Sequence, residues 1–147
     1  MTIRIATPED EPRIAELAGQ LGYPCGAEEV RGRLERILSN PAHRVYVAVL
    51  PETGVAGWIH FFLYQVLESD LRVEVAALVV DEACRGRGVG KALMARAEEW
   101  GREHGCRCVS LRSNVVRQEA HDFYQALGYT ILKTQHAFRK QLPKRGE

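Results

Sequence analysis

The stretch that most constrains this chain joins an apolar run, residues 73–80, to an amphipathic run, residues 89–104. The apolar run favours a buried strand, and the amphipathic run favours a helix. Three glycines at alternate positions lie between them, and they let the backbone turn tightly and let a ligand approach the N–H groups. The spacing therefore predicts a sharp turn from a strand into a helix.

The same turn carries three cations, Arg85, Arg87 and Lys91, and the first helical turn has no Asp or Glu. A helix start has up to four N–H groups without partners and the positive end of the helix dipole. Cations there are misplaced by about 0.3–1 kcal/mol each when exposed. An external anion would remove the conflict, so we predict a phosphate or pyrophosphate site. The alternative is a tight turn with solvated arginines.

Two well-known phosphate loops do not fit the spacing of this turn. A Walker A loop needs Gly-x-x-x-x-Gly-Lys-Ser/Thr, whereas position 85 is arginine and position 92 is alanine. A dinucleotide fingerprint needs Gly-x-Gly-x-x-Gly, and its third glycine would fall on Lys91. The pattern that fits is Gln/Arg-x-x-Gly-x-Gly/Ala, filled by Arg85, Gly88 and Gly90.

Length and composition narrow the class of protein. A chain of 147 residues predicts one domain, residues 1–147, with disorder expected at residues 143–147. A net charge of +1 argues against a general nucleic-acid partner. Every apolar run is shorter than the ~20 residues of a membrane span, and the N-terminus lacks signal-peptide features. The four cysteines show no metal-ligand spacing, so we expect reduced thiols, no metal and a cytoplasmic location.

Hydrophobic periodicity and turn signals predict seven strands and four helices in the order β-α-α-β-β-β-α-β-α-β-β. The strands are expected at residues 3–6, 43–50, 55–67, 71–80, 107–112, 129–133 and 135–142. The helices are expected at residues 7–21, 27–39, 89–104 and 118–127. Hairpins precede strand-helix-strand units, which predicts an α/β fold with a mixed, mostly antiparallel sheet and helices on both faces.

A second motif occupies residues 113–129, Ser-Asn-Val-Val-Arg-Gln-Glu-Ala-His-Asp-Phe-Tyr-Gln-Ala-Leu-Gly-Tyr. It is similar to the Asn-x5-Ala-x2-Phe-Tyr-x3-Gly-Tyr/Phe segment of the GNAT family of N-acetyltransferases, and the glycine turn resembles that family's coenzyme A loop. With the matching element order, the whole chain resembles a GNAT acetyltransferase. The resemblance implies the GNAT fold, acetyl-CoA as co-substrate, and acetyl transfer to a primary amine by direct attack in a ternary complex.

The resemblance also assigns the coenzyme's contacts. The pantetheine arm is expected between the fourth and fifth strands, beside Leu78, Val79 and Val80, with a backbone N–H near Leu78 stabilising the thioester oxyanion. Asn114 is expected to bond the pantetheine amides and Phe123 to pack on them, although Phe123 equally suits a core aromatic. The pyrophosphate would be held by Arg85, Gly86, Arg87, Gly88, Val89, Gly90 and Lys91.

Two residues are candidates for proton transfer. Glu74 lies eleven residues before Arg85, where some GNAT enzymes carry a glutamate base. Carboxylates are seldom buried, and partial burial would raise the pKa of this one toward a useful value. A solvent-facing position, a pair with Arg72, or an ordered water as the base are the alternatives. Tyr124 matches the family's general-acid tyrosine, with helix packing as the alternative. For His60, His121 and His136 we expect a surface or packing role rather than catalysis.

The acceptor is predicted to be a small or medium-sized primary amine, such as an aminoglycoside-like or polyamine-like molecule. By family analogy its site is lined by Tyr23, Tyr64, Glu68 and Asp70, and acids with tyrosines favour a cation. The alternative for Glu68 and Asp70 is that they are solvated turn residues. Competing functions are a non-catalytic acyl-CoA-binding module, a longer acyl donor or a peptide amine acceptor. A homodimer is a common arrangement in the family.

Overall fold

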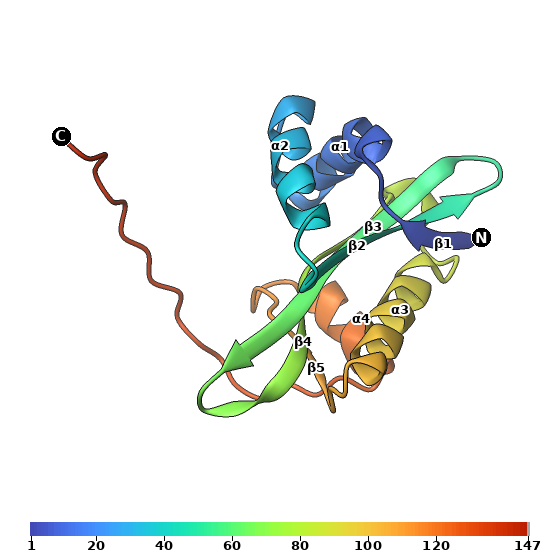
Figure 1. Ribbon diagram of the computed structural model, residues 1–147. Coiled ribbons are helices and arrows are strands. Elements are labelled where there is room, and N and C mark those ends of the chain that lie inside the picture. Colours follow the sequence, from blue (N-terminus) through green and yellow to red (C-terminus); the bar gives the residue numbers. More distant parts are fainter. Residues whose placement is uncertain (147) are drawn as a thin grey trace. The chain divides into compact units, whose positions relative to one another are not determined.

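The computed structural model describes residues 1–146. Contacts divide the chain into two compact units, residues 1–112 and the residues from 113 on. The strands, all in the first unit, are β1 (Thr2–Ile5), β2 (His43–Leu50), β3 (Gly54–Val66), β4 (Ser69–Val80) and β5 (Val109–Leu111). The helices are α1 (Glu11–Leu21), α2 (Ala27–Leu38), α3 (Val89–Glu103) and α4 (Gln118–Ala126), with short 3-10 turns η1 (Pro8–Asp10) and η2 (Glu82–Cys84) (Figure 1). Among the described elements, α4 alone belongs to the second unit.

One sheet organises the first unit, with the strand order β1-β2-β3-β4-β5. The pairs β1–β2, β2–β3 and β3–β4 are antiparallel, and β4–β5 is parallel. A parallel pair needs a crossover, and α3 supplies it between β4 and β5. The sheet is therefore mixed and mostly antiparallel, as predicted, and the glycine turn is the connection from β4 to α3.

One face of the sheet is covered by α1 and α2 (Figure 1). Ile14 of α1 and Val30 and Leu34 of α2 form a buried cluster with Val45 and Val47 of β2. These helical residues recur at the spacing of one helix face, and the two valines alternate along the strand, so each element presents one apolar side to the other.

The opposite face of the sheet is covered by α3 (Figure 1). Tyr46, which lies between the two valines in β2, accepts a hydrogen bond from Arg96 of α3 at 3.1 Å. Phe61 of β3 is fully buried and packs on Trp100 of α3 with 5.2 Å between ring centroids. Helices thus lie on both faces, and these contacts hold α3 against β2 and β3.

Gly57 of β3 lies close to the first turn of α3. A Cβ added at this position would lie 2.8 Å from the Val79 carbonyl oxygen and 3.0 Å from Val89 Cγ1. Only glycine leaves room for both groups, so this residue sets the distance between β4 and the first turn of α3.

The first helix is preceded by a capping box at Thr7 and Asp10, as the sequence indicates. The Asp10 carboxylate accepts from the backbone N–H of Thr7 at 2.8 Å and from two Arg4 nitrogens at 2.8 and 2.9 Å. Asp10 is 7% exposed. The Arg4 hydrogen bonds lower the pKa of Asp10, although burial opposes them.

The prediction of seven strands is wrong for the described chain, because residues 129–133 and 135–142 form no strand. A strand needs a neighbouring edge to pair with, and the local sequence does not specify one. Ile131, Leu132, Phe138 and Leu142 are between 66% and 94% exposed. The strand predicted at residues 107–112 is also shorter, Val109–Leu111. Part of the predicted disordered tail, residue 147, lies outside the described residues.

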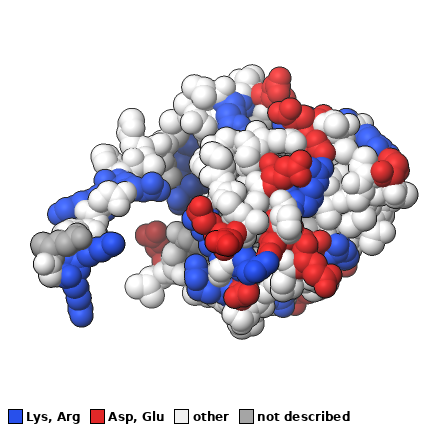
Figure 2. Space-filling view, turned by 90° about the horizontal axis from the view of Figure 1, so that it is seen from above, with Lys and Arg blue, Asp and Glu red and all other residues white. Residues whose placement is uncertain are grey.

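Acidic and basic side chains are interspersed over the face that Figure 2 presents. Among residues 1–146, no helix combines the length and the apolar character that crossing a membrane requires. The described residues also contain no group of three or more His, Cys, Asp or Glu side chains able to hold a metal ion.

Candidate active site

The connection from β4 to α3 is built as the sequence predicts. Gly86 and Gly88 have φ angles of 80° and 79°, a left-handed conformation that favours glycine. Gly88 is the N-cap of α3, and the first turn of this fully described helix has no acidic residue. Arg85, Arg87 and Lys91 are exposed. Three cations and the free N–H groups of a helix start share one surface, and an anion would stabilise both.

Asp81 holds the start of this connection against α1. Its carboxylate accepts from the Ala83 N–H at 3.1 Å, from Arg13, and from Gln20 Nε2 at 3.3 Å. Gln20 Oε1 in turn accepts from the Glu82 N–H at 2.9 Å. The Ala83 N–H and the Arg13 guanidinium lower the pKa of Asp81. Sequence reasoning missed this cluster.

Arg87 forms an ion pair with Glu52, which lies in the turn between β2 and β3. Both side chains are about half exposed. The pair lowers the pKa of the Glu52 carboxyl. One of the three predicted phosphate-binding cations therefore already has an anionic partner, and a bound phosphate would compete with it.

The edge of β4 that faces β5 is unpaired within the first unit along residues 76–80. β5 pairs with β4 only from Val73 to Val75, whereas on its other edge β4 pairs with β3 as far as Val80. Along this stretch β4 therefore has one paired and one unpaired edge, and successive residues direct their backbone groups to the two edges in turn. An unpaired edge offers N–H and C=O groups to an extended ligand, as in strand addition.

Glu74 is 8% exposed and lies where β4 and β5 still pair, opposite Ser110. Ser110 Oγ donates to Glu74 Oε2 at 2.5 Å and accepts from Arg72 Nε at 2.9 Å. The Arg72 guanidinium lies 4.2 Å from the centre of the Tyr64 ring. Arg72 therefore reaches Glu74 through a serine rather than directly, and sequence reasoning did not single out Ser110.

A cavity of about 670 Å³ lies between the two N-terminal helices and the sheet. Its lining comes from α1, the loop at residues 22–26, α2 and the strands β2, β3 and β4. The β4 residues are Ala76 and Ala77, which directly precede Leu78. Apolar side chains form most of its wall, with His60 and Trp58 contributed by β3. The volume is within the ~300–1,000 Å³ of small-molecule sites.

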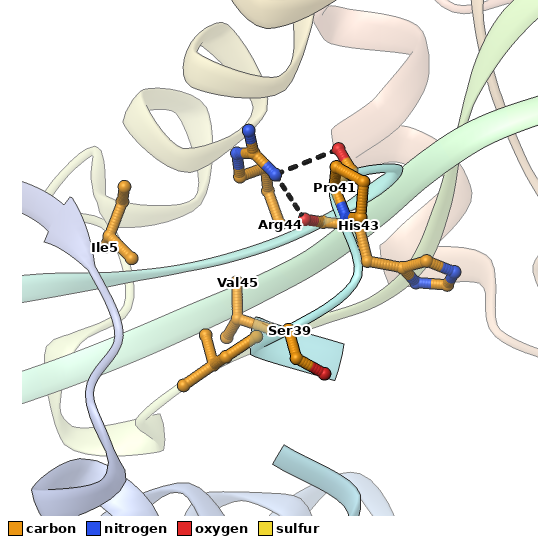
Figure 3. Close-up of a pocket in the computed structure, with 7 residues that line it drawn as sticks. Ile5, Ser39, Pro41, His43, Arg44 and Val45 are labelled. Atoms are coloured by element: carbon orange, nitrogen blue, oxygen red, sulfur yellow. Dashed lines mark hydrogen bonds between the residues drawn. The ribbon is translucent and has the colours of Figure 1, made fainter. Parts of the chain in front are cut away.

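A smaller hollow of about 330 Å³ lies at the start of β2 (Figure 3). Arg44 closes one side by donating to the carbonyl oxygens of Pro41 and His43 at 3.1 and 2.8 Å. The His43 ring points away from the other labelled side chains (Figure 3). The Arg44 guanidinium is engaged by these backbone carbonyls, so it is less available to bind a ligand in this hollow.

His43 and His60 form a hydrogen-bonded pair, with 2.9 Å between Nδ1 and Nε2. The rings are stacked with 5.2 Å between centroids. Burial, and then the neighbouring His43, lower the pKa of His60 to about 4. Burial also lowers the pKa of His43. His60 lines the large cavity, and its imidazole is uncharged at neutral pH.

The four predicted acceptor residues do not share one place in the first unit. Tyr23 lines the large cavity. Tyr64 packs under Arg72, and Glu68 and Asp70 are exposed at the hairpin between β3 and β4. Within the described residues, none of these last three lines that cavity.

The second unit holds the other predicted residues. Asn114 Oδ1 accepts from the Val116 N–H at 3.1 Å, which closes a short turn before α4. Phe123 and Tyr124 of α4 lie edge to face, with 5.0 Å between ring centroids. Burial raises the pKa of Tyr124, while the charge of Arg117 opposes this rise. The phenol is therefore protonated at neutral pH and can donate a hydrogen bond.

Comparisons with known proteins identify the family. The Acetyltransferase (GNAT) family model matches residues 12–129. The uncharacterized N-acetyltransferase YhdJ of Bacillus subtilis (strain 168) is 32% identical over 140 residues, covering 90% of this chain and 89% of the relative. Aminoglycoside N(6')-acetyltransferase type 1 of Stenotrophomonas maltophilia is 29% identical over 145 residues, covering 96% and 94%. The chain belongs to the GNAT family of acetyltransferases, which confirms the predicted family and enzyme class.

Solved structures share the fold. Aminoglycoside N-acetyltransferase AAC(6')-Iy in complex with CoA matches with a TM-score of 0.84 at 22% identity, covering 96% of this chain and 95% of that chain. A Trypanosoma brucei acetyltransferase matches with a TM-score of 0.78 at 23% identity, covering 95% and 99%. These likenesses confirm the predicted GNAT fold class.

Proposed function

We propose that the protein transfers the acetyl group of acetyl-CoA to a primary amine, by direct attack in a ternary complex. The observation that carries the proposal is the unpaired edge of β4, which leads directly into a helix start with three exposed cations. An extended ligand arm can pair with the strand edge, and a pyrophosphate at its end can bind the cations and N–H groups of the helix start. A solved relative of the same fold is a complex with CoA.

The coenzyme would be held along this edge. Residues 85–91 bind the pyrophosphate through cations and N–H groups, and residues 78–80 bind the pantetheine through backbone groups. Asn114 and Phe123 are assigned to the pantetheine by the motif that they belong to. The exposure of Arg85 and Lys91 and the left-handed glycines support the first assignment, because both leave N–H groups and charges accessible.

The reaction requires three proton transfers. The acceptor arrives as an ammonium and loses a proton, for which Glu74 is the proposed base. The amine nitrogen then attacks the thioester carbonyl carbon, and the Leu78 N–H stabilises the oxyanion. When the carbon–sulfur bond breaks, Tyr124 protonates the thiolate, the nitrogen gives up its second proton to the resulting phenolate, and the products are the acetylated amine and CoA. The buried, hydroxyl-bonded position of Glu74 supports a specific role, because carboxylates are rarely buried without one.

The proposed acceptor is a small or medium-sized primary amine. A relative named as an aminoglycoside acetyltransferase makes an aminoglycoside one candidate. The predicted site residues Tyr23, Tyr64, Glu68 and Asp70 remain proposals, and Tyr23 has the added support of lining the large cavity.

A homodimer is also proposed. Its support is the apolar surface of residues 129–142, where Ile131, Leu132, Phe138 and Leu142 are exposed. An exposed apolar surface of this kind can pack against a second copy of the chain. Light scattering on the purified protein tests this proposal, and a monomeric mass at all concentrations would refute it.

The catalytic roles are tested by Glu74→Gln and Tyr124→Phe. Each should lower kcat by about 10²–10⁴-fold with little change in CoA affinity, because the roles belong to proton transfer rather than docking. Native turnover in both variants would assign these residues to packing. CoA binding without turnover by the native protein would favour the alternative function, a non-catalytic acyl-CoA-binding module.

A further inference from the structure

The large cavity lies against the part of β4 where the acetyl group is expected. Ala76 and Ala77 form its β4 wall, and Leu78, the proposed oxyanion donor, follows them. Across the β3–β4 ladder, His60 is the direct partner of Ala77. A molecule in this cavity would therefore approach the thioester from the side of His60. This step rests on the proposed function.

The cavity has almost no net charge. Glu29 is the one carboxylate among its described lining residues, and Arg33, one helical turn later, is its one permanent cation. Their side chains form an ion pair with 3.3 Å between Nη2 and Oε2. His60 is uncharged at neutral pH, because burial lowers its pKa to about 4. The remaining wall is mostly apolar.

This lining decides what kind of amine fits. A polyamine or an aminoglycoside would place several ammonium groups against a mostly apolar wall whose single carboxylate is already paired, and an ammonium that loses water there without gaining a partner is unfavourable. An apolar body would instead gain from leaving water. The same burial lowers the pKa of an amine, which eases the loss of the proton that precedes attack.

We propose that the acceptor is a monoamine with an apolar body, of the alkylamine or arylalkylamine class, bound in this cavity with its nitrogen beside His60. The imidazole supports this orientation. In the tautomer whose Nε2–H donates to His43 Nδ1, the other ring nitrogen of His60, Nδ1, is an acceptor, and it makes no hydrogen bond within the described chain. The N–H group of an amine could donate to it. The acceptor preference of this chain thus differs from that in the names of its aminoglycoside-acetylating relatives.

The test compares kcat/KM of the native protein for 2-phenylethylamine and hexylamine with kcat/KM for spermidine and kanamycin. We expect the monoamines to be favoured about tenfold or more, the discrimination that an apolar pocket typically provides. Equal values, or a preference for the polycations, would overturn the inference and leave the acetyltransferase function intact.

Substitutions of the two exposed charged residues of the cavity, Arg33 and Glu29, provide a matched pair of variants. Arg33→Gln leaves Glu29 unpaired and should move the preference toward spermidine by about two- to fivefold, whereas Glu29→Gln should move it by a similar factor toward the monoamines. An unchanged ratio in both variants would contradict the charge explanation and the inference.

If no amine is turned over, calorimetric titration of the CoA-loaded protein with the same amines separates the two proposals. Tighter binding of 2-phenylethylamine would support the acceptor class although transfer fails, and equal or weaker binding would overturn it.

Discussion

Gly57 gives the sharpest test of how the structure positions the coenzyme turn. In Gly57→Ala the new methyl carbon would meet the Val79 carbonyl oxygen at 2.8 Å and Val89 Cγ1 at 3.0 Å. The first contact is shorter than real Cβ atoms show, and a carbonyl in a sheet cannot turn freely without disturbing the strand pairing. We expect the variant to lose about 1–3 kcal/mol in the free energy of unfolding, the usual cost of overpacking a core.

The same substitution should also weaken CoA binding. The strain is relieved only by moving Val79 or the first turn of α3, and both belong to the proposed coenzyme site. Gly19→Ala is the matched control, because a Cβ there meets nothing within 4 Å and alanine favours a helix. It should raise stability by up to about 1 kcal/mol.

Urea unfolding and calorimetric CoA titration of both variants provide the measurements. If Gly57→Ala unfolds at the native urea concentration and binds CoA with native affinity, the described distance between β4 and α3 is wrong.

Three further predictions concern charged groups. Arg87→Ala should weaken CoA binding by about 1–3 kcal/mol, and Glu52→Gln should strengthen it because a competing anion is removed; calorimetry showing no change in either contradicts the ion-pair account. Because its arginine partner lowers the pKa of Asp10 in the folded state, that stabilisation is complete above the unfolded pKa of about 3.9 and is lost as the pH falls through the lower folded pKa. Acid-unfolding curves of Asp10→Asn should therefore show lower stability at neutral pH and less loss on acidification. The Glu68→Gln/Asp70→Asn variant tests the hairpin acids: a raised KM for the best amine would place them at the acceptor site, and an unchanged KM would remove them.

Local signals carried most of the fold prediction. The three long strands match the predicted ranges within about two residues, because apolar alternation and the turn at residues 51–53 are both short-range features. Gly86 and Gly88 adopt the left-handed conformation that the glycine spacing indicates. The phosphate-site prediction followed from the same local chemistry, namely cations at a helix start.

Contacts between distant residues were not predictable from the pattern. Asp81 and Arg13 are 68 positions apart, and Ser110 and Glu74 are 36 positions apart, so no spacing rule connects them. The same limit explains the two missing strands, since pairing depends on an edge elsewhere in space. The pairing of His43 with His60 likewise depends on the register of β2 against β3.

The most direct test of the proposed function is amine-dependent thiol release from acetyl-CoA by the native protein. The account predicts that CoA forms in proportion to an acetylated primary amine, identified by mass spectrometry, and that release without an amine is negligible. Binding of CoA with no amine-dependent release, or acetylation of alcohols or thiols alone, would contradict it.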